Sequence, residues 1–170
     1  MRHAQDPRRN SNQAQEVQPR YKAMSARDRF EHTRDCVKRL KEVQLLIMYE
    51  CDDWQPPNVK AKGAISDPTA TRAIAMVDEL SEKLEALKQE ESELESFIGE
   101  SLAIINAVEI GLGEEYSTLL DARYIECWSW ADVVKYTGFK RTHGCKLLNV
   151  AFDWIDSLGV SRLLKGEFEL

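Results

Sequence analysis

A heptad repeat between positions 77 and 112 constrains the fold of this chain more than any other feature of its sequence. Nine of the eleven seam residues are apolar: one seam position holds Val77, Leu84, Glu91, Ile98, Ile105 and Leu112, and the other holds Leu80, Leu87, Leu94, Ser101 and Val108. This pattern is typical of a long helix that packs along one side as in a coiled coil. Asp67 and Pro68 predict its start, because aspartate accepts hydrogen bonds from free amides and proline fits the first helical position. We expect a helix over about residues 68 to 111, which at 1.5 Å per residue spans roughly 65 Å.

A second apolar stripe precedes this helix. Ser25 and Asp28 resemble a helix N-cap, and helical spacing then relates Phe30, Val37, Leu40, Val43, Leu46 and Ile47. The consecutive prolines 56 and 57 break the pattern, because proline lacks an N–H donor and restricts the residue before it. We expect a helix over about residues 26 to 50 that pairs with the long helix as an antiparallel hairpin, in a unit of residues 25 to 112.

The seam of this hairpin leaves two arrangements open. It is filled either within the chain or by a second copy, in a homodimer through residues 68 to 112. Glu91 at a seam position requires a lysine or arginine from the first helix if it is buried. Otherwise that stretch is solvated or belongs to a different partner.

Charge is distributed unevenly along the chain, whose formal net charge is -6. Residues 1 to 49 hold eleven Lys and Arg against six Asp and Glu, whereas residues 66 to 116 hold three against thirteen. Residues 1–24 are polar and basic with almost no apolar side chains, which predicts a disordered basic arm. The acid is concentrated in one segment, so the overall sign says little about the C-terminal part.

The C-terminal part, residues 113–160, has the pattern of a helix-turn-helix domain, followed by a tail over 161–170. After Gly111 and Gly113 a short amphipathic helix turns Tyr116, Leu119, Leu120, Tyr124 and Ile125 inward. Ser129 and Asp132 then predict a capped helix whose apolar face holds Trp130, Val133 and Val134. Gly138 predicts a left-handed turn, and a second helix follows with Cys145, Leu148, Phe152 and Ile155 on one face.

The outward face of this second helix carries the predicted DNA-binding residues. With the apolar residues turned inward, Arg141, Thr142, Lys146 and Asn149 face outward, and Lys140 and His143 lie near the rim. Arg and Lys contact guanine edges or phosphates, and Asn binds adenine through two hydrogen bonds. A helix-turn-helix inserts its second helix into the major groove, so we expect double-stranded DNA as the partner.

The run from Leu119 to Ile155, LLDARYIECWSWADVVKYTGFKRTHGCKLLNVAFDWI, resembles the C-terminal region-four domain of bacterial sigma factors. The matching pieces are RYI, the tryptophan that opens the first helix, the turn glycine and the pair Ala151 and Phe152. Two positions depart from the family pattern: Lys140 stands where a serine is usual, and Gly144 where a branched apolar residue packs against the first helix. From about residue 25 onward the chain is also similar to small phage and prophage proteins, which resemble late-operon transcriptional activators of Gram-positive phages.

These observations predict an all-α, cytoplasmic transcriptional regulator. No P-loop, GxSxG or HExxH motif is present, so we expect no enzyme and no cofactor. The spacing of the four cysteines favours reduced thiols over a metal site, and no stretch reaches the ~20 apolar residues of a membrane span. The alternatives are an oligomeric phage assembly or DNA-packaging subunit and an RNA-polymerase-binding protein without direct DNA contact.

Overall fold

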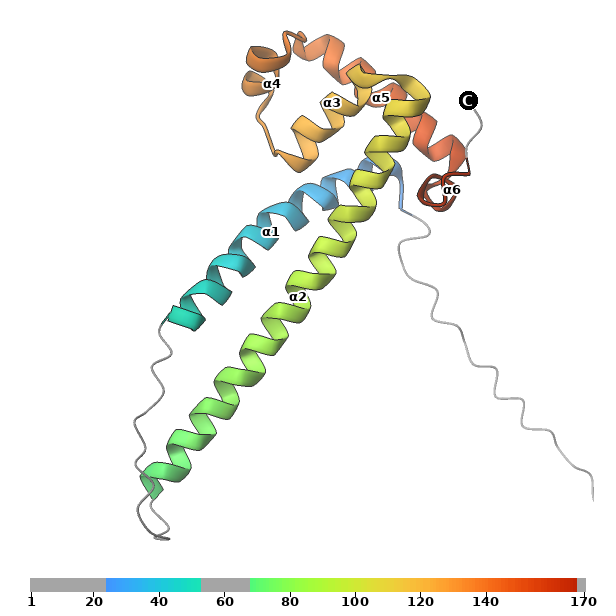
Figure 1. Cartoon of the computed structure of the whole chain (residues 1–170). Helices are drawn as coiled ribbons and strands as arrows, with labels where there is room; N and C mark the ends of the chain where they lie inside the picture. The colour runs from blue at the N-terminus through green and yellow to red at the C-terminus, as the bar shows by residue number, and fades with distance from the viewer. Residues whose placement is uncertain (1–23, 53–67, 168–170) are drawn as a thin grey trace, which may run out of the picture.

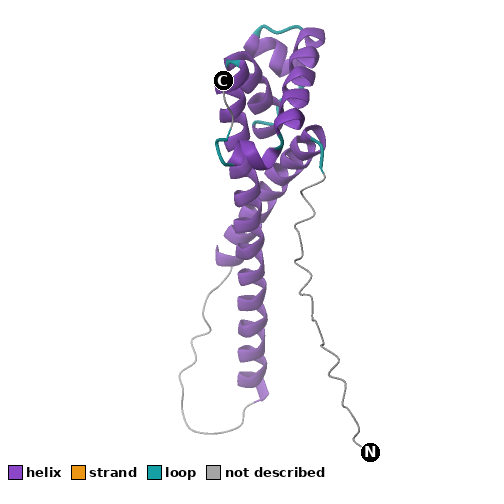
Figure 2. Cartoon of the chain, turned by 90° about the vertical axis from the view of Figure 1, so that its right-hand side faces the viewer, coloured by secondary structure: helices purple, strands orange, loops and turns teal. Residues whose placement is uncertain are grey.

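The computed structural model describes residues 24–52 and 68–167, and all regular structure in these two stretches is helical (Figure 2). The predicted all-α class is therefore confirmed for this part of the chain. The elements are α1 (Ala26–Asp52), α2 (Pro68–Leu112), α3 (Glu114–Leu120), a π-helical turn (Asp121–Ile125), α4 (Trp130–Thr137), α5 (Arg141–Leu158) and α6 (Val160–Leu164). The predicted basic arm lies outside the described residues except for Met24, as does the proline segment between α1 and α2.

The start of α1 is capped from two sides. The Ser25 hydroxyl accepts a hydrogen bond from the Asp28 amide at 3.2 Å, as the sequence predicts. Asp156 of α5 accepts a second one from the Ala26 amide at 2.7 Å. The second contact ties the beginning of α1 to α5, 130 residues later in the chain.

α1 and α2 run antiparallel, because partners later in α1 are earlier in α2 (Figure 1). Ion pairs along the two helices follow this order: Arg29 with Glu100 at 2.6 Å, Arg39 with Glu90 at 2.7 Å, and Lys83 with Glu50. Glu91 itself is half-buried, and its neighbour Glu90 makes the ion pair with α1. Arg29 is buried, whereas the pairs of Arg39 and Lys83 lie at exposed positions, where salt bridges fix register more than they add stability.

The polar seam residue Ser101 is fully buried and has a partner. Its hydroxyl lies 2.8 Å from the Thr33 hydroxyl of α1, which is also fully buried. A paired hydroxyl avoids the penalty of an unsatisfied buried polar group and favours this register over shifted ones. The prediction that Leu46 widens the apolar stripe is wrong, since Leu46 is 40% exposed near the end of α1.

The main core lies where the start of α1 and the end of α2 meet α3 and α5 (Figure 1). Phe30 of α1 is its centre, with ring centroids 5.5 Å from Tyr124 and 6.0 Å from Phe152. Fully buried aliphatic residues from four elements surround it: Ile104, Val108, Leu119, Leu120, Val133 and Ile155. The C-terminal helices are therefore packed on the α1–α2 pair through a shared core.

The stretch interpreted as a tail, residues 161–170, contains most of the short helix α6. Gly159 interrupts the chain after α5 with φ 83°, and α6 then packs against α2 and α5. Leu163 is buried in the core. The sequence did not reveal α6, because five residues are too few to show a helical period.

Candidate nucleic-acid interface

The start of α4 is fixed by the predicted capping box. The Ser129 hydroxyl accepts a hydrogen bond from the Asp132 amide, and the Asp132 carboxylate accepts one from the Ser129 amide, both at 3.2 Å. Hydrogen bonding to Ser129 holds the pKa of Asp132 below its ordinary value. The beginning of α4 is thus specified by local sequence.

The apolar face of α4 is narrower than the sequence suggests. Val133 is fully buried, whereas Val134 is 41% exposed, so the prediction that Val134 lies inward is wrong. Successive helical residues are about 100° apart, and Val133 shares its side of the helix with Trp130, three residues earlier. A helix of eight residues packed along that side leaves Val134 to solvent.

Gly138 ends α4 in the left-handed conformation predicted for it, with φ 75° and ψ −3°. Its amide donates to the Val134 carbonyl at 3.1 Å, and the Phe139 amide then donates to the Thr137 hydroxyl at 3.2 Å. Glycine enters this region of φ without steric conflict. The chain turns here and α5 begins at Arg141.

Gly144 brings α4 and α5 close together. It is buried, and a Cβ atom built on it would lie 2.8 Å from Cζ3 of the Trp130 ring. The Trp130 ring therefore occupies the space where the sigma-factor pattern expects a branched side chain at position 144. Arg123 stacks on the same ring, 4.9 Å from its centre.

The outward face of α5 holds all the predicted DNA-binding residues. Within the described chain every one of them is exposed: Lys140, Arg141, Thr142, His143, Lys146 and Asn149. The opposite side of the helix is buried in the core through Leu147, Leu148, Ala151, Phe152 and Ile155, and Cys145 is half-buried between the two sides. This polar, cationic side is not covered by the described part of the chain.

The first turn of α5 is open to an acceptor. Lys140 occupies the N-cap position without a side-chain cap, and no acidic residue lies in the first turn. Free amides and the helix dipole favour a negative group at such an end. His143 lies beside this turn, with its ring 5.7 Å from that of Phe139.

Arg27 of α1 also belongs to this face, which the sequence did not reveal. Its guanidinium donates to the Asn149 side-chain oxygen at 2.7 Å and lies 5.1 Å from the Phe152 ring centre. This hydrogen bond uses one of the two lone pairs of the oxygen, so the predicted bidentate contact of Asn149 with adenine would share the oxygen with Arg27 or displace Arg27 from it. A contact between residues 122 positions apart carries no local sequence signature.

The rest of the described chain offers no competing site for a metal. Among residues 24–52 and 68–167, no group of three or more His, Cys, Asp and Glu side chains is arranged to hold an ion. Cys36, Cys127 and Cys145 are free thiols. Over the same residues, no helix has the length and apolar character needed to cross a membrane.

Comparison of the chain with models of protein families, with curated protein sequences and with solved structures gave no match. The resemblance to sigma-factor region four therefore stays a prediction that depends on the residues quoted above. Function is therefore inferred from the geometry of α4, the Gly138 turn and α5.

Proposed function

We propose that this chain is a DNA-binding transcriptional regulator, in which α4, the Gly138 turn and α5 act as a helix-turn-helix. The first half of α5 would enter the major groove, with Arg141 and Lys146 contacting bases or phosphates. The observation that carries this proposal is the division of α5 into a buried apolar side and an exposed side on which all six predicted contact residues lie.

Charge along α5 supports an approach by its N-terminal half. Lys140 is the N-cap, and Arg141 and Lys146 lie in the first half of the helix, whereas Asp153 and Asp156 lie in the second. Asp156 is held by the α1 amide of Ala26. A duplex would therefore meet cations and open amides at one end of α5 and be repelled at the other.

The α1–α2 pair is the proposed means of contact with a second protein, either another copy of the chain or RNA polymerase. Large apolar side chains are half or more exposed toward its far end: Leu45, Met48, Tyr49 and Met76. Exposed side chains of this kind favour association. Light scattering on the purified chain distinguishes these two partners. A dimer supports self-association, whereas a monomer that co-purifies with RNA polymerase supports the polymerase as the partner.

The test of DNA binding is fluorescence anisotropy with a labelled mixed-sequence duplex of about 30 base pairs, between about 50 and 200 mM salt. The double variant Arg141→Glu/Lys146→Glu should bind about 100-fold more weakly and show a salt dependence reduced by about two counterions. The matched control is Lys41→Glu/Lys88→Glu, the same change of charge at exposed positions of α1 and α2. Equal losses in the two variants would show a nonspecific charge effect and would reject the proposed interface.

A further inference from the structure

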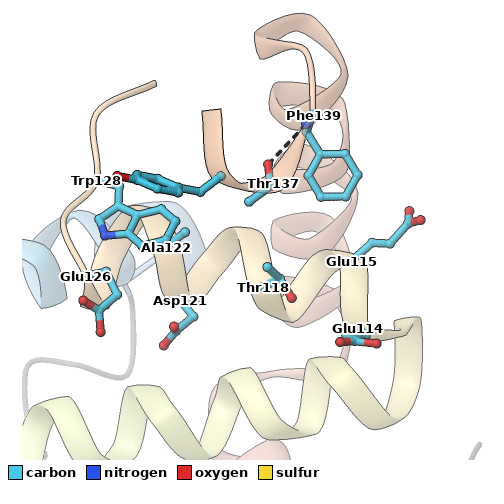
Figure 3. A pocket seen from close by; sticks show the side chains of 10 residues that line it. Glu114, Glu115, Thr118, Asp121, Ala122, Glu126, Trp128, Thr137 and Phe139 are labelled. Carbon is cyan, nitrogen blue, oxygen red and sulfur yellow. Dashed lines mark hydrogen bonds between the residues drawn. The ribbon is translucent and has the colours of Figure 1, made fainter. Parts of the chain in front are cut away.

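A cavity beside α3 and α4 has the opposite charge to the α5 face (Figure 3). It has a volume of about 570 Å³ and is lined by α3, the π-helical turn, α4 and the connecting residues Glu126, Trp128 and Phe139. None of its lining residues belongs to α5. The surface is therefore separate from the proposed DNA interface.

Aromatic rings form one wall of this cavity. The rings of Trp128 and Tyr136 lie with their centroids 5.1 Å apart, and Phe139 also lines the cavity, on the far side of Thr137 from Trp128 (Figure 3). Tyr136 is 62% exposed, so a large part of this ring meets solvent instead of the core. Lys135, just outside the cavity, places its ammonium 4.8 Å from the Tyr136 ring centre, which shows that a cation already approaches this ring.

Carboxylates lie at both ends of this cavity. Asp121 and Glu126 lie together near Trp128, and Glu114 and Glu115 lie at the other end of the cavity (Figure 3). Among the described residues that line it, none is a lysine, arginine or histidine. Burial, together with the charge of Glu126, raises the pKa of Asp121 above its ordinary value. An incoming cation would relieve the repulsion between these two carboxylates.

We propose that this cavity binds an arginine side chain presented by a partner protein. A guanidinium stacks on an aromatic face with its plane and donates several hydrogen bonds to carboxylates with its edge, and the cavity offers both. Nucleic acid is excluded as its ligand by charge. The proposal does not depend on the DNA-binding function, because the two surfaces share no residue.

We assign the cavity to a second protein that presents an arginine, and this chain's own N-terminal segment is the alternative occupant that the experiment tests. The cavity lies against α3 and α4. Arginines at positions 8 and 9 make the segment a competitor that the experiment must test.

The experiment is an NMR titration of the full chain with the peptide acetyl-Ala-Arg-Ala-amide, and with its Gln counterpart as the neutral probe. We expect the arginine probe to shift the Trp128 indole and the Tyr136 amide and to bind at least about tenfold more tightly than the glutamine probe. Asp121→Asn/Glu126→Gln should remove at least about nine-tenths of this affinity, whereas Glu85→Gln/Glu95→Gln, the same charge change on exposed positions of α2, should leave it unchanged.

Two further variants keep the test decisive. Tyr136→Ala removes an exposed ring, so the fold should survive and the arginine probe should lose at least about tenfold in affinity. Equal shifts from both probes, or unchanged affinity in Asp121→Asn/Glu126→Gln and in Tyr136→Ala, would overturn the proposal. A gain of about tenfold or more in Arg8→Gln/Arg9→Gln would identify the chain's own segment as the occupant and would also overturn it.

Discussion

The two surfaces of the C-terminal helices differ in the sign of their charge and in the way that charge is held. At the α5 face, Lys140, Arg141 and Lys146 are exposed at the N-cap and in the first half of the helix. Arg27 of α1 adds a cation to this face through its hydrogen bond to Asn149. At the cavity, Asp121 and Glu126 lie near Trp128, and Glu114 and Glu115 of α3 lie at the other end. A net charge of -6 describes neither surface, so the partners of this chain must be inferred from local geometry.

The two surfaces meet at the packing of α4 on α5. Trp130 of α4 lies against Gly144 of α5, and Phe139, which lines the cavity, has its ring 5.7 Å from that of His143 on the exposed side of α5. Changes at this junction should disturb both surfaces together, whereas changes on either surface should act on one alone.

Gly144→Val should have the largest effect. A Cβ at position 144 meets the rigid Trp130 ring at 2.8 Å, so we expect the free energy of unfolding to fall by about 3 kcal/mol, together with weaker duplex binding. Gly99→Ala is the matched control in the exposed middle of α2, where nothing lies within 4 Å, and it should stabilise the chain by up to about 1 kcal/mol. Urea unfolding measures both, and a Gly144→Val chain as stable as the wild type would contradict the packing described.

Arg27→Gln should affect binding at the α5 face and leave binding at the cavity unchanged. Loss of this cation and of its bond to Asn149 should weaken duplex binding by about tenfold, because a charge-assisted contact near the duplex is lost. Binding of the arginine probe at the cavity should not change. Lys41→Gln is the control. Equal duplex affinity in the two variants would show that Arg27 does not contribute to the proposed interface.

Lys140→Ser, at the start of α5, should raise the stability of the chain and weaken its binding to duplex DNA. Serine would supply the side-chain cap that α5 lacks and should raise the free energy of unfolding by about 1 kcal/mol, while Ser129→Ala should lower it by a similar amount at the capped start of α4. The same Lys140→Ser chain should bind duplex DNA a few-fold more weakly, since one cation is lost. Thermal unfolding and anisotropy on both variants test this pair of opposite effects.

Asp121→Asn should have the smallest effect, which should appear only above the ordinary pKa of an aspartate. The folded-state pKa of Asp121 is raised by burial and by Glu126, so ionisation destabilises the folded chain as pH rises through the interval between the ordinary value of 3.8 and this raised value. The variant should therefore have a higher Tm than the wild type at pH 7, because the cost of ionising Asp121 builds up in this interval and persists at every higher pH. The difference should vanish below the ordinary value, and a lower Tm for the variant at pH 7 would contradict the assignment.

Local sequence patterns predicted the helices well. The first helix was expected over about residues 26 to 50 and the long one over about 68 to 111, and they occupy Ala26–Asp52 and Pro68–Leu112. Ser129 and Gly138 also act as predicted, because caps and left-handed turns depend on a few neighbouring residues.

Contacts between distant residues were the part that sequence patterns did not reveal. Arg27 with Asn149, Asp156 with the start of α1, and Trp130 with Gly144 all depend on how the helices pack, and helical periodicity contains no information on such pairs. The acidic cavity was missed for the same reason, since its residues are unremarkable until α3 and α4 bring them together.

The most direct test of the central claim is amide NMR mapping of the full chain with a duplex of about 30 base pairs at low salt. The account predicts shifts concentrated on Lys140, Arg141, Thr142, Lys146 and Asn149 and on Arg27, with the cavity residues Asp121 and Glu126 unchanged. Shifts spread along α1 and α2 with the first half of α5 unaffected, or no shift at any residue, would contradict it.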